Sequence, residues 1–241
     1  MKTGTILLVP HGGNGSSVTF ANECARYLES KGRHNVSVAV GDGNRTPFEV
    51  MSSMFNEEGV DTFCILPLCI SEGMLTVWRL PERLHLPDNA GSWTMVGDHD
   101  VATRFSTALG TSERMSEAIL DGLGQPNPDR GAVLLFHGSE LSVAGRVAQY
   151  YRERMVQAGW KCSEAFAKSG PVSPSEAVVR LISQGCGKVT VVPFYISADG
   201  GSYSRALSEM REAGIPVEES QPISRYPVFM EILDSKVPED W

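Results

Sequence analysis

The sequence lacks long apolar runs, and this excludes a membrane-embedded chain. Its longest apolar stretches have the length of a strand, whereas a membrane-spanning helix needs about 20 apolar residues. The first residues, MKTGTILLVPHGG, carry one lysine and a run of only about six apolar residues, too short for a signal peptide. We therefore expect a cytoplasmic protein.

The sequence also lacks paired cysteines and an excess of positive charge. It has five cysteines, an odd number, and no C-x-x-C motif, which predicts reduced thiols and no structural zinc site. The formal net charge of −8 argues against nucleic acid or an anionic membrane as a general partner. The net charge does not exclude a local basic pocket.

Several catalytic motifs are missing as well. The segment HGGNGSS at residues 11–17 leads toward a helix but matches neither G-x-G-x-x-G nor G-x-x-x-x-G-K-[ST], so nucleotide binding is not indicated. There is no G-x-S-x-G and no H-E-x-x-H, which excludes the common serine hydrolase and metalloprotease sites.

What the sequence does contain is an internal repeat. ILLVPHGG at residues 6–13 matches AVLLFHGS at residues 132–139, and each reads as an apolar strand that ends in His-Gly. The spacing from His11 to Pro67 equals the spacing from His137 to Pro193. We infer a duplication and predict two domains, residues 1–125 and residues 126–241, joined by the connector GQPNPDRG.

Each half alternates short strands with helices. Apolar strands separated by helices predict parallel sheets covered on both faces, and hence two tandem Rossmann-like α/β domains. The expected strands lie at residues 5–9, 36–40, 61–67, 93–96, 132–136, 162–166, 189–193 and 217–219. In the first half we expect helices at residues 17–30, 47–56 and 75–84, and mostly helix over residues 103–123.

The repeat places one histidine after the first strand of each half. In open parallel sheets ligands bind beyond the carboxyl ends of the strands, so His11 and His137 are expected on the ligand side and could face one cleft. The glycine after each histidine lets the backbone turn sharply and leaves the imidazole uncovered. Imidazole binds divalent metals and moves protons near neutral pH. The alternative is a histidine that only positions its loop.

These features together resemble a known family. A strand ending in His-Gly-Ser, a helix, and a strand ending in proline before a loop of small residues resemble the class II tetrapyrrole metal chelatases, specifically the internally duplicated CbiX-type sirohydrochlorin chelatases. PISRYPVFMEIL at residues 222–233 is similar to the family's closing segment. The resemblance implies two chelatase-like domains and insertion of Co²⁺, Fe²⁺ or Ni²⁺ into a sirohydrochlorin-type tetrapyrrole without ATP. The metal is then a substrate, and no tightly bound cofactor is expected.

The resemblance implies roles for the two histidines, but a second histidine of the family pattern is missing from both halves. His11 and His137 correspond to the residue that binds the metal or accepts pyrrole protons. A second family histidine, expected about eight residues past the proline, is replaced by Leu75 and Gly201. The acids that remain nearby, Glu72 and Asp199, could take over a catalytic role or be solvated loop residues.

Further residues are candidates for binding the substrate. Arg79 and Arg205 follow the two prolines at equal distances and could bind the carboxylates of a sirohydrochlorin, or be surface arginines. Three residues beside the histidines are assigned to the same role: Gly12, Gly138 and Ser139. Three aromatic residues could line a flat ligand or pack between elements: Trp78, Tyr195 and Tyr203.

Two other functions remain open. The loss of the second histidine in both halves also fits a protein that binds a tetrapyrrole or a metal without inserting it, or an enzyme of changed chemistry on the same fold. The duplication supplies the twofold pairing within one chain, which favours a monomer over a homodimer.

Overall fold

The structure is a computed structural model that describes residues 4–11, 15–33, 35–41, 45–86, 93–239 and 241. Its contacts divide the chain into two compact units. Unit 1 comprises Met1–Leu109 together with Met230–Trp241, and unit 2 comprises Gly110–Phe229.

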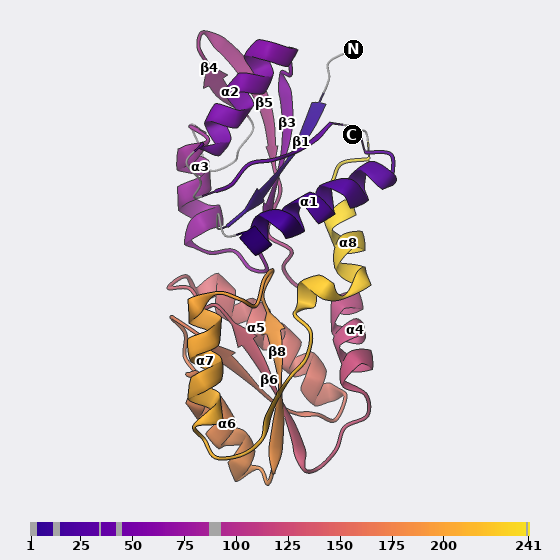
Figure 1. The fold of residues 1–241 in the computed structure, drawn as a ribbon, viewed down its shortest axis with the longest axis vertical. Coiled ribbons are helices and arrows are strands. Elements are labelled where there is room, and N and C mark those ends of the chain that lie inside the picture. The colour runs from indigo at the N-terminus through magenta and orange to yellow at the C-terminus, as the bar shows by residue number, and fades with distance from the viewer. Residues whose placement is uncertain (1–3, 12–14, 34, 42–44, 87–92, 240) are drawn as a thin grey trace. The chain divides into compact units, whose positions relative to one another are not determined.

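Unit 1 is built on a sheet whose described strands follow the order β2-β1-β3-β5-β4. Figure 1 labels β1, β3, β4 and β5. The strand β1 runs parallel to β2 and β3, and β3 runs parallel to β5. The strands are β1 (Gly4–Pro10), β2 (Val36–Val38), β3 (Thr62–Leu68), β4 (Trp93–Val96) and β5 (His99–Phe105). The helical segments are α1 (Gly15–Ser30), α2 (Pro47–Glu58), the π-helix η1 (Leu75–Arg79) and α3 (Leu80–Arg83).

Alternate residues of these strands pack on opposite faces of the sheet. Leu7 and Val9 of β1 lie in a buried cluster with Met51 of α2, Leu75 of η1 and Leu80 of α3. The helix α1 also packs on β1 and β2. Because successive side chains of a strand point to opposite faces, unbroken apolar strands such as β1 and β3 require cover on both sides.

One edge of this sheet differs from the prediction. The strand expected at residues 93–96 is present as β4, but it pairs antiparallel with β5 in a hairpin whose turn contains Gly97 at φ 59°. The first part of the helix predicted over residues 103–123 is wrong, because β5 extends to Phe105 and helix α4 begins at Glu113. The strand β5 has exposed residues among its buried ones, so it lacks the apolar run that marks a strand covered on both faces.

Unit 2 has a sheet whose described strands follow the order β7-β6-β8-β9, all of them parallel. The strands are β6 (Arg130–Phe136), β7 (Lys161–Phe166), β8 (Lys188–Phe194) and β9 (Val217–Glu219). The helical segments are α4 (Glu113–Leu123), α5 (Ser142–Gln157), α6 (Pro174–Ser183), α7 (Gly201–Arg211), the 3₁₀ turn η2 (Ile223–Arg225) and α8 (Pro227–Asp234), whose second half belongs to unit 1.

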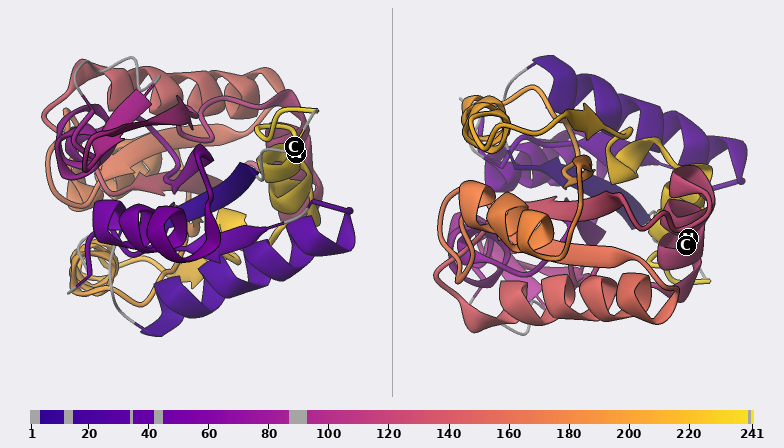
Figure 2. Two further views of the ribbon diagram at one scale, coloured as in Figure 1. Left: turned by 90° about the horizontal axis from the view of Figure 1, so that it is seen from above. Right: turned by 90° about the horizontal axis from the view of Figure 1, so that it is seen from below.

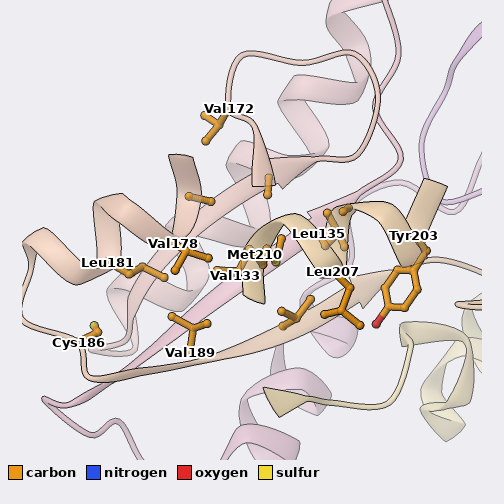
Figure 3. Close-up of a cluster of buried hydrophobic side chains, with 14 residues drawn as sticks. Val133, Leu135, Val172, Val178, Leu181, Cys186, Val189, Tyr203, Leu207 and Met210 are labelled. Atoms are coloured by element: carbon orange, nitrogen blue, oxygen red, sulfur yellow. The ribbon is translucent and has the colours of Figure 1, made fainter. Parts of the chain in front are cut away.

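The core of unit 2 lies on both faces of its sheet, and Figure 2 shows helices on both sides of each sheet. On one face, Val133 and Leu135 of β6 pack with α6 and α7, as Figure 3 shows. On the other face, Phe194 stacks on Phe136 at 4.3 Å between ring centroids and contacts Tyr151 of α5 at 4.7 Å. The mostly parallel α/β fold expected for each half is confirmed.

The two units do not coincide with the predicted domains, 1–125 and 126–241. The helix α4 precedes the predicted boundary but belongs to unit 2, and the last residues of the chain belong to unit 1. The Arg33 guanidinium anchors those last residues by an ion pair with Asp234 at 2.9 Å. It also donates to the backbone carbonyls of Pro238 and Trp241, each at 3.0 Å. No helix among the described residues is long and apolar enough to span a membrane.

Candidate active site

His11 follows the last residue of β1 and is exposed. The strand β1 lies between β2 and β3, so the loops after these neighbours emerge at the same edge of the sheet. The loop after β2 is held close, because the Gly41 amide donates to the Pro10 carbonyl at 3.0 Å. His11 therefore stands at the carboxyl edge of a parallel sheet, as predicted. Gly12, assigned to substrate binding, lies outside the described residues.

His137 has the equivalent position after β6, between β7 and β8, and is also exposed. Its backbone carbonyl accepts a hydrogen bond from the Lys168 amide at 3.0 Å, so the loop after β7 supports it from one side. On the other side, its Nδ1 lies 3.4 Å from the Ser202 hydroxyl at the start of α7. The ring of Tyr195 meets the imidazole edge-on at 6.1 Å between centroids.

The glycine after His137 is required by the backbone. Gly138 has φ 87°, and a Cβ at this position would overlap the carbonyl oxygen of Ser169. The hydroxyl of Ser139 accepts a hydrogen bond from the Leu141 amide at 3.2 Å, which fixes the approach to α5. Gly138 thus lies against Ser169 in the loop after β7, and Ser139 contacts its own loop. Their role in substrate binding stays a prediction.

Gly138→Ala is expected to lower the free energy of unfolding by about 2 kcal/mol, because the new methyl group meets backbone and the positive φ disfavours alanine. Gly145→Ala is a suitable control, since its Cβ would meet nothing within 4 Å inside helix α5. We expect that control to gain up to about 1 kcal/mol. Urea denaturation measures both, and equal stability of the two variants would contradict the expectation.

Glu72, a candidate catalytic acid, is part of an anchored cluster in unit 1. Its carboxylate accepts the Ala108 amide at 2.6 Å. The Lys236 ammonium donates to the Thr107 hydroxyl at 3.0 Å and to the Ala108 carbonyl at 3.2 Å. Burial, with a smaller contribution from Glu72, raises the pKa of the Cys69 thiol to about 12. These contacts give Glu72 a structural task, and its catalytic role stays a prediction.

The other predicted site residues lie on the segments that follow β3 and β8. Asp199 is exposed and immediately precedes Gly200, which caps α7. Arg79 is exposed at the end of η1, and Arg205 is exposed on α7. Short π-helices such as η1 are frequent at functional sites. The two arginines thus have equivalent places after the carboxyl ends of equivalent strands.

Two of the three aromatic candidates are packing residues of unit 2. Tyr203 is buried, and its hydroxyl donates to the Glu219 carboxylate at 2.6 Å. The rings of Tyr195 and Tyr203 meet edge-on at 5.3 Å. Burial raises the pKa of both phenols, and for Tyr195 the neighbouring Ser202 hydroxyl partly offsets the rise. Trp78, in contrast, is 54% exposed and available to a ligand.

Ser202 is the contact that the sequence analysis missed. It comes directly after Gly201, the position at which the resemblance implies a second histidine. Its position in the sequence could therefore have identified Ser202 as a candidate site residue. Its contact with His137, however, depends on how α7 packs next to the end of β6. Among the described residues, no group of three His, Cys, Asp or Glu side chains is arranged to hold a metal ion.

Comparison with known proteins agrees with this architecture. The chain is similar to a multi-domain protein of Deinococcus radiodurans, described as structurally similar to chelatases, with 21% identity and a TM-score of 0.69. The match covers 98% of this chain and 54% of that one, so the chain spans about half its length.

The chain is also similar to two structures of SirB. SirB of Bacillus subtilis with Fe³⁺ has 14% identity and a TM-score of 0.75, with 97% of this chain and 94% of that chain covered. The sirohydrochlorin chelatase SirB of Bacillus subtilis subspecies spizizenii, in complex with cobalt, has 14% identity and a TM-score of 0.68, with coverages of 98% and 94%. At these identities the likeness establishes the fold.

No curated protein matches the sequence. The family model named CbiX matches residues 5–125, which is half of the chain. This match establishes the family: the chain belongs to the CbiX family.

Proposed function

We propose that the protein inserts a divalent metal, Co²⁺, Fe²⁺ or Ni²⁺, into a sirohydrochlorin-type tetrapyrrole without ATP. The observation that carries the proposal is an exposed histidine directly after an inner strand of each parallel sheet, in a chain of the CbiX family. This edge of an open α/β sheet is the usual place for a ligand. The SirB structures with Fe³⁺ and with cobalt support iron and cobalt among these metals, because SirB shares the fold.

The proposed chemistry needs few protein groups. Two pyrrole N–H protons must leave and the metal must pass to the four ring nitrogens. An exposed neutral imidazole at His11 or His137 can accept a proton or hold the metal for a short time. Exposed guanidinium groups at Arg79 and Arg205 suit bidentate binding of the macrocycle's carboxylates. The facing of the two histidines across one cleft stays a prediction.

The metal is a substrate in this proposal, and no tightly bound cofactor is required. We propose that the protein works in the cytoplasm, as a monomer, with the tetrapyrrole as its small-molecule partner. The absence of a nucleic-acid or membrane partner is part of the same proposal and rests on the net charge of −8.

A second function has its own supporting observation. Both units lack the second family histidine, with Leu75 and Gly201 in its place. Leu75 is buried in the core of unit 1, so it brings no polar group to the site. A protein that binds the tetrapyrrole or the metal without inserting it would tolerate this loss.

One experiment separates the two functions. The protein is mixed with sirohydrochlorin and Co²⁺, Fe²⁺ or Ni²⁺, and the absorbance spectrum is followed against the uncatalysed reaction. Acceleration with at least one metal is expected. A spectral change with tetrapyrrole alone, and no acceleration with any metal, would overturn insertion and favour the binder. The absence of any response would overturn both.

A further inference from the structure

The structure brings a serine hydroxyl onto the strand-end histidine of unit 2. Ser202 Oγ lies 3.4 Å from His137 Nδ1, at the long end of the range for a hydrogen bond. Hydrogen bonds of catalytic groups are often long before the substrate binds and then tighten. Ser202 is the second residue of α7, so a regular helix holds it in place.

The second hydroxyl near Ser202 is that of Tyr195. The Tyr195 hydroxyl oxygen is buried, and no hydrogen bond reaches it from the described residues. A buried polar atom without a partner is rare and calls for an explanation. The Ser202 hydroxyl is close enough to Tyr195 to affect the pKa of the phenol. A serine hydroxyl can donate its proton to a phenol oxygen such as that of Tyr195.

Donation of the Ser202 proton to Tyr195 would set the direction of both hydrogen bonds. A serine hydroxyl has one proton to donate and two lone pairs that accept. If its proton goes to Tyr195, the hydroxyl can only accept from His137. His137 Nδ1 then carries the proton, and Nε2 is the unprotonated ring nitrogen. An imidazole that binds a metal commonly donates its other N–H in this way.

We propose that Ser202 is a positioning residue that holds His137 in the Nδ1-protonated tautomer, with Tyr195 as the acceptor for the Ser202 hydroxyl. The metal or the pyrrole proton would then meet His137 Nε2. This inference deepens the proposed function and rests on it for its catalytic meaning.

The matching residue of unit 1 behaves differently. By the equal spacing of the two halves, Thr76 corresponds to Ser202. The Thr76 hydroxyl accepts the Gly73 amide at 3.0 Å and lies 3.2 Å from the Gly73 carbonyl, to which it donates. Its single proton is therefore used within its own loop. The contact of Ser202 with His137 is thus a feature of unit 2 and not a general property of the repeat.

The test is ¹⁵N NMR of the histidine side chains, at a pH where the imidazoles are neutral and without metal or tetrapyrrole. The His137 resonances are identified by their loss in His137→Ala. In the wild-type protein we expect the proton on Nδ1. In Ser202→Ala we expect it on Nε2. Tyr195→Phe keeps the ring but removes the acceptor, so Ser202 can turn its proton to Nδ1 and Nε2 becomes protonated there too.

Two control variants accompany this test. Ser202→Thr keeps a hydroxyl and is expected to give the wild-type tautomer. Ser208→Ala makes the same change at an exposed position of the same helix and is expected to leave His137 unaltered. Unfolding curves establish that each variant is folded. If Ser202→Ala keeps the wild-type tautomer, the inference is wrong.

The rate of metal insertion tests whether the positioning of His137 by Ser202 matters for catalysis. Ser202→Ala is expected to lower kcat about 10-fold, with KM within about twofold, because positioning partners of this kind are worth 10- to 100-fold. If the wild-type protein inserts no metal but its tautomer depends on Ser202, the positioning stands and the proposed function fails. If the wild-type protein inserts metal and Ser202→Ala changes neither readout, this inference fails and the function stands.

Discussion

The variant that carries both His11→Ala and His137→Ala is expected to lose metal insertion by a factor of about 10² to 10⁴, the usual contribution of a positioned acid–base group. Both side chains are exposed at the carboxyl edge of their sheets, where no core packing depends on them. The loss is therefore expected in kcat, with folding unchanged. Initial rates of insertion, followed by absorbance with sirohydrochlorin and the preferred metal, measure it.

The single variants His11→Ala and His137→Ala show which unit carries the catalytic histidine. If one unit carries the site, one single variant matches the double variant and the other keeps the wild-type rate. His99→Ala is the matched control, because His99 is another exposed histidine of unit 1, located on β5. It is expected to insert metal at the wild-type rate. A folded double variant with wild-type rate would show that neither strand-end histidine takes part.

Deletion of residues 230–241 is expected to unfold unit 1 and leave unit 2 folded. The deletion removes the buried side chains of Leu233 and Val237 and all three partners of the Arg33 guanidinium. Loss of one buried leucine side chain alone costs about 2–5 kcal/mol, and a domain has only about 5–15 kcal/mol of stability. Hydrogen exchange measured by mass spectrometry is expected to show fast exchange in β1 and β3 and slow exchange in β6 and β8.

A single substitution tests the role of the terminal segment in the stability of unit 1 if the shortened chain aggregates. Arg33→Met removes the guanidinium but keeps much of the apolar stem, and we expect it to destabilise unit 1 alone, by about 2–3 kcal/mol. Glu239→Gln, at an exposed position of the same segment, is the control and is expected to leave the unfolding midpoint unchanged. Uniform protection of both units in the shortened chain would show that the terminal segment is dispensable.

The parts of the fold that were predicted correctly have strong local signals. The strands β1, β3, β6 and β8 are mainly apolar because helices pack on both of their faces, and this apolar character is visible in the sequence. The strand β5 was missed because it lies next to the edge strand β4 and alternates exposed with buried residues. Its polar residues resemble one face of an amphipathic helix.

In the candidate site, too, features with a local sequence signal were predicted and features without one were not. The places of His11 and His137 follow from strand topology, which the repeat made visible. The anchoring of Glu72 near Lys236 and the contact of Ser202 with His137 join residues far apart in the chain. Such contacts depend on the packing of particular elements, and one sequence holds no local signal for them.

The return of the last residues to unit 1 has a consequence for synthesis on the ribosome. Unit 2 is one continuous segment, Gly110–Phe229, so all of its strands can pair once that segment has emerged. Unit 1 begins the chain but must wait for Met230–Trp241 before Arg33 finds its partners. Domains generally fold as units during synthesis, the N-terminal one first. Here the order is reversed: the half made first is the half completed last.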